Sequence, residues 1–214
     1  MKALDVLKNK IFTEEQLRWE LNRWQLKDEK VVFTNGCFDL LHQGHIDYLS
    51  KAADLGTKLI VGVNSDASIK RLNKGKSRPI QDETSRAIII AALHFVSAVV
   101  IFDETNPLNL ITFIRPTVLV KGSDYKIEEI VGHEVVQSYG GLVKTIDFLQ
   151  GYSTSAIEAK IKYSAVYFYW RRTLQPFTKN LPNNIIKQKS MKKQWPVMKK
   201  QWLRALIISQ LSKV

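Results

Sequence analysis

The chain has 214 residues, of which 45% are hydrophobic and 24% are charged. This much apolar surface excludes a disordered protein for most of the length, and the single cysteine, Cys37, excludes an internal disulfide or a cysteine-cluster zinc site. No apolar run reaches the roughly 18 residues that span a bilayer, and Met1 to Lys10 lacks the pattern of a secretory signal, so we expect a cytoplasmic protein.

The formal net charge of +12 comes from the end of the chain. All 20 acidic residues precede residue 162, whereas residues 162–214 are rich in Lys and Arg and repeat the motif Met191–Trp195 as Met198–Trp202. Residues 1–161 carry no net charge, which argues against a nucleic-acid-binding domain. The tail either contacts an anionic membrane or polyanion, or is an extension without a function of its own. We favour the second reading, because nothing in the tail has catalytic spacing.

The predicted elements begin with a helix over residues 12–27, where Thr13 and Gln16 form a capping box. Strands are then predicted at 31–33, 58–63, 97–102, 117–120 and 142–146, and they alternate with helices at 45–55, 84–93, 107–114, 131–139 and 153–161. The alternation predicts a Rossmann-like α/β fold, with a parallel five-stranded sheet and helices on both faces. We divide the chain into an N-terminal helical segment (1–28), a single globular domain (29–161) and the basic C-terminal tail (162–214). Ligands of such sheets bind where the strands end.

Two histidines follow the first strand, in the stretch 34–45 (TNGCFDLLHQGH). His42 and His45 are three positions apart at the start of a helix, so both rings can face the same side, and Gly44 leaves room for a ligand. The helix start adds unpaired backbone N–H groups and the positive end of its dipole. This combination predicts a phosphate site. The alternatives are a helix cap or a metal pair with Asp39 as third ligand.

Three further segments follow other strands of the predicted sheet. Residues 71–79 carry four cations, Lys74 and Lys76 among them, and Arg86 follows on the next helix. Residues 120–125 (VKGSDY) end a strand, and residues 151–155 (GYSTS) open the last helix. Each alone is typical of a solvated loop or an N-cap. Together at strand ends they indicate contacts to a triphosphate and a ribose.

The His-x-Gly-His element, with Ser-Thr-Ser opening a late helix, resembles the nucleotidyltransferase superfamily of cytidylyltransferase-like proteins. Residues 12–161 are most similar to the adenylyltransferase domain of bacterial D-glycero-β-D-manno-heptose 1-phosphate enzymes, on residues 33–39, 120–125 and 139–141. Glycerol-3-phosphate cytidylyltransferases carry Arg-Thr-Glu ahead of the late hydroxyl motif. Residues 148–152 lack it here, which counts against cytidylyl transfer.

The resemblance implies in-line transfer from ATP to a heptose 1-phosphate, giving ADP-heptose for lipopolysaccharide core biosynthesis and pyrophosphate. It implies catalytic roles for His42, His45 and Lys76, substrate binding by Asp39, and nucleotide contacts from Cys37, Phe38, Gly44, Lys74, Arg86, Gly122, Asp124, Ser153, Thr154 and Ser155. Mg²⁺ would arrive with ATP, and no protein metal ligand is named.

Two predictions about partners and two alternative functions accompany this interpretation. About 30 residues precede the first strand, so we expect a separate sugar kinase. The sequence leaves the oligomeric state open, although Trp19 and Trp24 could mark the surface of a homodimer. The alternatives are a cytidylyltransferase for glycerol phosphate or a similar alcohol phosphate, and a module that binds anionic membranes or nucleic acid through the tail.

Overall fold

The computed structural model describes residues 2–72, 78–161 and 164. The chain divides into two units, Met1–Glu158 and Ala159–Val214, and the first unit contains every labelled element. The predicted contacts Lys74 and Lys76 and all of the predicted tail except residue 164 lie outside the described residues.

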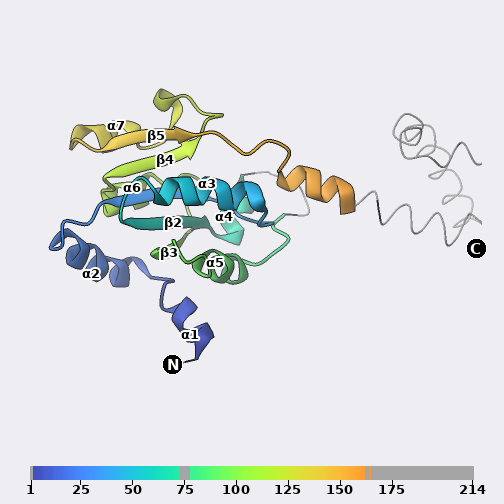
Figure 1. Cartoon of the computed structure of the whole chain (residues 1–214), viewed down its shortest axis with the longest axis horizontal. Helices are drawn as coiled ribbons and strands as arrows, with labels where there is room; N and C mark the ends of the chain where they lie inside the picture. The colour runs from blue at the N-terminus through green and yellow to red at the C-terminus, as the bar shows by residue number, and fades with distance from the viewer. Residues whose placement is uncertain (1, 73–77, 162–163, 165–214) are drawn as a thin grey trace, which may run out of the picture. The chain divides into compact units, whose positions relative to one another are not determined.

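Five parallel strands form one sheet in the order β3-β2-β1-β4-β5 (Figure 1). The strands are β1 (Val31–Gly36), β2 (Lys58–Asn64), β3 (Ala98–Phe102), β4 (Val118–Gly122) and β5 (Leu142–Ile146). The chain builds outward from β1 to β3 and then returns to add β4 on the other side of β1. The switch point therefore lies between β1 and β4, and it is the place where such sheets bind ligands. The predicted Rossmann-like fold is confirmed.

Helices occupy most of the predicted ranges. They are α1 (Ala3–Lys8), α2 (Glu14–Gln25), α3 (Gln43–Ala53), α4 (Asp66–Arg71), α5 (Glu83–Ala91), α6 (Leu108–Ile114), α7 (His133–Ser138) and the 3₁₀ helix η1 (Ile127–Glu129). The capping box is confirmed, because Thr13 N–H donates to Gln16 Oε1 at 2.9 Å and Thr13 Oγ1 accepts from Gln16 N–H at 3.2 Å. Residues 154–161 are also helical. The short α1 and η1 were not predicted, since each has too few residues to show a period.

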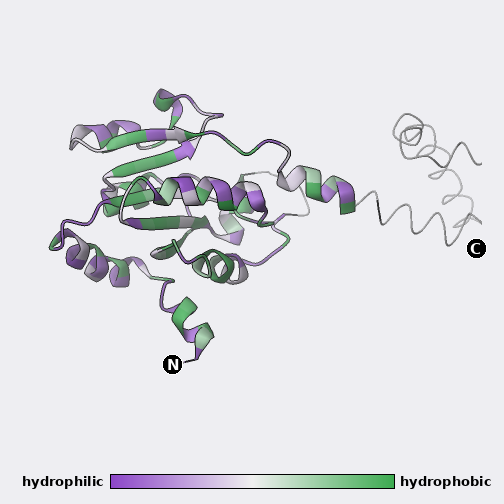
Figure 2. Cartoon of the chain, viewed as in Figure 1, coloured by the Kyte–Doolittle hydropathy of each residue, from purple (hydrophilic) through white to green (hydrophobic). Residues whose placement is uncertain are grey.

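Two apolar layers sandwich the sheet, because successive strand residues face opposite sides. Val32, Leu59 and Val61 face α3 and α5, whereas Val31, Phe33 and Ile60 face α2, α6 and α7. Figure 2 shows the strands mainly hydrophobic and the helices two-sided. The packing positions the end of β1 and the start of α3 rigidly at the switch point.

The two tryptophans of α2 have different surroundings. Trp24 is 5% exposed and belongs to the core beside α6, whereas Trp19 is 74% exposed. The prediction that both mark a dimer surface is therefore wrong for Trp24. Its spacing from Leu17 places it on the buried stripe of the helix.

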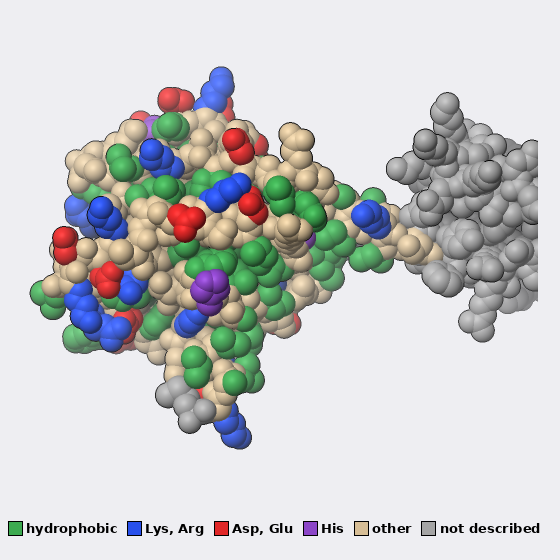
Figure 3. Space-filling view, in the orientation of Figure 1, with side chains coloured by type: hydrophobic (Ala, Val, Ile, Leu, Met, Phe, Trp, Pro, Cys, Tyr) green, Lys and Arg blue, Asp and Glu red, His purple; other side chains and the backbone are tan. Residues whose placement is uncertain are grey.

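Charges of both signs are interspersed over the face seen in Figure 3, as the balanced composition of residues 1–161 predicts. Among the described residues, no helix combines the length and the apolar character that crossing a bilayer requires.

Candidate active site

The two predicted histidines lie together at the carboxyl end of β1. His42 occupies the N-cap position of α3, and His45 lies in its first turn. Their rings stack, with centroids 3.9 Å apart and planes inclined by 19°. Among the described residues, the His42 side chain makes no capping hydrogen bond, and no group of three His, Cys, Asp or Glu is placed to hold a metal. The His42 side chain therefore does not cap α3, and the pair has no third ligand of these types beside it among the described residues.

Burial disfavours the charged form of both rings. The Nδ1 atoms of His42 and His45 are buried and have no hydrogen-bond partner among the described residues. Burial, with a smaller contribution from the neighbouring His42, lowers the pKa of His45 to about 4, and burial also lowers the pKa of His42. Each residue keeps part of its surface exposed. A phosphate oxygen that reaches the pair would therefore meet ring N–H donors whose partial burial strengthens the hydrogen bond.

This burial predicts an acid-sensitive fold. The unfolded chain protonates His45 near pH 6.5, whereas the folded protein resists protonation until about pH 4. Between these values the unfolded state binds more protons, so the free energy of unfolding should fall as the pH is lowered from 6.5 to 4. The free energy of unfolding, measured with urea at several pH values, should depend less steeply on pH in His45→Gln than in the wild type. Identical pH slopes would contradict the burial.

The backbone between β1 and α3 takes a sharp turn at Phe38. Its φ of 47° lies in the left-handed region, which a bulky residue adopts at a cost of about 1–3 kcal/mol. The side chain is 8% exposed, and its ring meets that of His45 edge-on with centroids 5.4 Å apart. Phe38 therefore supports the histidine pair, and the turn stores strain where the predicted ligand binds.

The position of the Asp39 side chain does not fit the predicted contact with substrate. Its side chain is almost fully buried, and Oδ1 accepts hydrogen bonds from the backbone N–H groups of Ile80 (2.8 Å) and Gln81 (3.0 Å). The Asp39 carbonyl accepts a third bond from Gln81 Nε2 at 2.8 Å. Asp39 thus ties the loop before α5 to the loop after β1, and its carboxylate is not presented to a substrate.

Arg86 also differs from the prediction. Its side chain is fully buried, and all three of its nitrogens donate to protein acceptors. Nη1 donates to the Cys37 carbonyl at 2.7 Å, Nη2 to Asp66 Oδ1 at 2.7 Å and Nε to the Gln81 carbonyl at 3.0 Å. The Arg86 guanidinium therefore uses its donors to hold the protein fold together. Its bond to the Cys37 carbonyl fixes the backbone at the end of β1. Cys37 directly follows β1 and is half-buried.

The last predicted helix starts beside the histidines. A side chain added at Gly44 would place its Cβ 3.0 Å from Tyr152 Cβ and 3.1 Å from His42 Nδ1. Ser153 caps the helix, because its Oγ accepts from Ala156 N–H at 3.1 Å. Ser153 and Ser155 are exposed and Thr154 is half-buried. The structure therefore brings the hydroxyl motif next to Gly44, and only glycine fits between them without displacement.

The end of β4 completes the predicted set. Gly122 is buried, and the Phe148 ring occupies the space that a side chain there would need. Asp124 is exposed. Lys121, which the sequence reading did not single out, donates to both the Asn35 side chain and the Asn35 carbonyl, so it joins β4 to β1 across the switch point. Its place at a strand end beside Gly122 was the available signal.

Two other residues at this edge were not named from the sequence. Arg78 is one of the four cations in residues 71–79, and Glu158 lies in the predicted helix 153–161. The structure pairs them, with Arg78 Nη2 2.5 Å from Glu158 Oε1. No local pattern links positions 80 residues apart, so sequence alone offered no signal for the pair.

The chain is similar to several known proteins. Residues 33–160 match the family model described as cytidylyltransferase-like. The chain is 54% identical over 153 residues to the Bifunctional protein HldE of Campylobacter jejuni subsp. doylei, covering 72% of this chain and 32% of that protein. It is 57% identical over 134 residues to the Bifunctional protein HldE of Campylobacter concisus, covering 63% of this chain and 27% of that protein.

The chain thus spans about a third of the length of the curated relatives it matches. Among solved structures, the lipopolysaccharide core biosynthesis protein of Thermoplasma volcanium is 30% identical, with a TM-score of 0.49, over 58% of this chain and 99% of that one.

Proposed function

The chain belongs to the cytidylyltransferase-like family, and we propose that it transfers the adenylyl group of ATP to D-glycero-β-D-manno-heptose 1-phosphate, releasing pyrophosphate. The observation that carries the proposal is the stacked His42–His45 pair at the switch point, next to the helix that opens with Ser153 to Ser155. The choice of sugar rests on the resemblance of residues 33–39, 120–125 and 139–141 to heptose 1-phosphate adenylyltransferase domains. Identity above 50% to proteins named HldE supports it.

The chemistry requires positioning and charge stabilisation. An oxygen of the sugar phosphate attacks the α-phosphorus in line, the bond to the β-phosphate oxygen breaks, and pyrophosphate leaves with the electron pair. No covalent intermediate on the protein is needed, so Cys37 is not required as a nucleophile. His42 and His45 would donate ring N–H groups to phosphate oxygens as negative charge develops, and the start of α3 would add the positive end of its dipole.

The other residues would bind rather than react. Gly122, Asp124 and the Ser153–Ser155 segment would line the base and ribose side, and Phe38 would back the histidines. Lys74 and Lys76 keep their predicted role as triphosphate contacts on the sequence argument alone. Arg86 and Asp39 would act through the loops that they hold.

Mg²⁺ would accompany ATP. The residues present fit such an ion, because Mg²⁺ retains several waters and takes phosphate oxygens as ligands, so it needs no cage of protein carboxylates. It would neutralise phosphate charge. The acceptor must come from an enzyme that phosphorylates the anomeric oxygen of the sugar, and the use of ATP suits a cytoplasmic reaction.

Product analysis tests the proposal. Pyrophosphate release should be measured with ATP or CTP, each against a panel of sugar 1-phosphates and glycerol 3-phosphate, with products identified by mass spectrometry. We expect ADP-heptose from ATP and the heptose 1-phosphate. A CDP-alcohol as main product would favour the cytidylyltransferase alternative. Loss of all activity on deleting residues 162–214, with salt-sensitive binding of vesicles or DNA, would favour the binding-module alternative.

A further inference from the structure

A nearly buried ion pair joins the loop before α5 to the last helix. Arg78 Nη2 lies 2.5 Å from Glu158 Oε1, and Arg78 Nη1 lies 3.9 Å from Asp39 Oδ2. The Arg78 and Glu158 side chains are 15% and 19% exposed. We propose that Arg78 is a positioning residue that holds the Ser153–Ser155 helix start at the histidine pair through Glu158. This inference rests on the proposed function, since it assigns a role within the same site.

One end of this connection is fixed by Asp39. Its Oδ1 is held by two backbone N–H groups, and its Oδ2 is buried with no hydrogen-bond partner among the described residues. A buried carboxylate is costly unless a cation lies close, and Arg78 supplies that charge. Asp39 alone therefore attracts the Arg78 guanidinium to this position. The fork geometry of arginine lets the same guanidinium reach a second carboxylate, that of Glu158.

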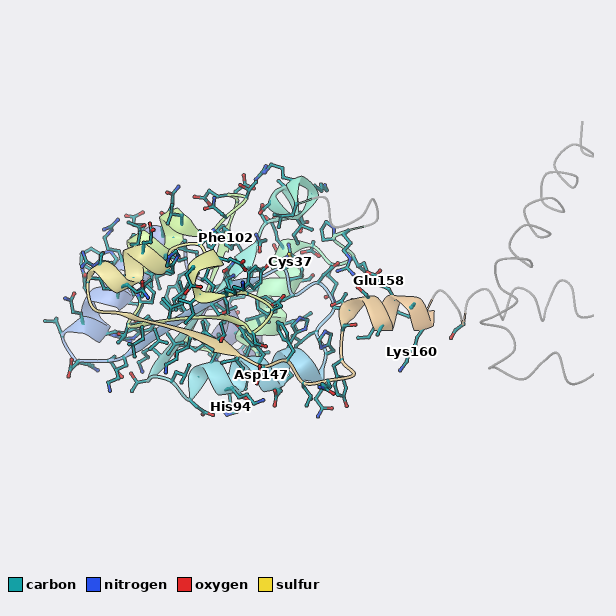
Figure 4. The ribbon with its side chains drawn as sticks, turned by 90° about the horizontal axis from the view of Figure 1, so that it is seen from above. Cys37, His94, Phe102, Asp147, Glu158 and Lys160 are labelled. Carbon is teal, nitrogen blue, oxygen red and sulfur yellow. The ribbon has the colours of Figure 1, made fainter. Side chains whose placement is uncertain are left out.

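The other end is the helix that carries the hydroxyls. Thr154 and Glu158 are four residues apart in the helical segment 154–161, so they lie on the same face, and Figure 4 shows Glu158 projecting from this segment. Tyr152, which directly precedes Ser153, lies beside Gly44. Residues 152–158 are thus attached twice, once beside His42 and once at Arg78. Two attachments fix both the position and the direction of the helix start.

This pair differs from the other ion pairs at the surface. The Arg23–Glu20 pair leaves 62% of the Arg23 side chain exposed, and such exposed pairs contribute little to the free energy of unfolding. Arg78 and Glu158 are largely shielded from water, so their attraction is screened less. The pair is therefore better placed to restrict the last helix than an exposed pair would be.

A competing role makes the opposite prediction. Arg78 could instead contact the triphosphate directly, with Glu158 pairing with Arg78 only while ATP is absent. In that case, removing the Glu158 charge would leave the Arg78 guanidinium available to ATP. Glu158→Gln would bind ATP as well as or better than the wild type, while Arg78→Lys would weaken binding. In the positioning role both substitutions weaken ATP binding, and their effects overlap.

The test measures the ATP dissociation constant by calorimetry and kcat and KM by pyrophosphate release, for Glu158→Gln, Glu158→Asp, Arg78→Lys and the double variant Arg78→Lys/Glu158→Gln. We expect Glu158→Gln to lower kcat/KM for ATP on the order of 10- to 100-fold, because misplacing a binding group by about 1 Å has effects of this size. Glu158→Asp should recover part of the loss, and the double variant should be no worse than the poorer single variant. Glu20→Gln is the matched control and should behave as the wild type.

Wild-type kinetics and ATP affinity in Glu158→Gln would overturn the inference, as would tighter ATP binding. Arg78→Lys keeps a charge near Asp39, and the Glu158 variants leave that carboxylate untouched, so the test does not depend on a variant that misfolds. If the wild type binds ATP but makes no ADP-sugar, the proposed reaction fails, while weakened ATP binding by Glu158→Gln would still support the positioning role.

Discussion

Replacing His45 with alanine should lower kcat by about 100- to 1,000-fold, because loss of one donor to developing transition-state charge costs about 2.7–4 kcal/mol. His45 stacks on His42 and is partly buried, and alanine supplies no N–H donor at this position. The measurement is turnover with saturating ATP and acceptor, together with circular dichroism to show that the fold persists.

His94→Ala is the matched control for this substitution. His94 is exposed, and its ring contacts Phe95. It should therefore retain wild-type turnover. Near-normal turnover in His45→Ala would remove this residue from the catalytic set, and equal losses in both variants would show that the effect is not specific to the site.

Replacing Arg86 with methionine should lower the free energy of unfolding by about 3–5 kcal/mol, the usual cost of breaking a buried ion pair. The substitution leaves the Asp66 carboxylate without its partner and the Cys37 and Gln81 carbonyls without their donors. Urea unfolding measures the loss. Activity should also fall, because the Cys37 backbone would no longer be held.

Arg23→Met provides the comparison, since Arg23 forms an exposed pair with Glu20 and should change the free energy of unfolding by about 1 kcal/mol or less. A similar small change in Arg86→Met would contradict the scaffold role. If Arg86 bound the nucleotide instead, the variant would unfold normally and show a raised KM for ATP.

The histidine pair could be predicted from the sequence because its geometry is local. A spacing of three at a helix start fixes both rings on one side, whatever the rest of the chain does. The strand pattern likewise placed the Ser153–Ser155 segment at the same edge as the pair. Even the burial of Trp24 was present in the sequence, in its helical spacing from Leu17, although a surface role was assigned to it.

The roles of Arg86 and Asp39 could not be predicted in this way. Arg86 meets Cys37 across 49 positions, and Asp39 meets Ile80 across 41. Nothing in the residue types says whether a cation after a strand end faces a ligand or the backbone of another loop. The end of β1 was also set too early, because Asn35-Gly36 is typical of a turn, although β1 runs to Gly36. In the fold the Thr34 hydroxyl is buried and pairs with that of Tyr48 at 2.7 Å.

The most direct test of the account is the response of the four histidines to nucleotide. Protein labelled with ¹⁵N-histidine should be titrated with a non-hydrolysable ATP analogue while the imidazole resonances are recorded. The account predicts saturable shifts of the His42 and His45 resonances and a rise in the pKa of His45 from about 4, whereas the resonances of His94 and His133 should not move. Saturable binding of the analogue that leaves the resonances of His42 and His45 unmoved would contradict it.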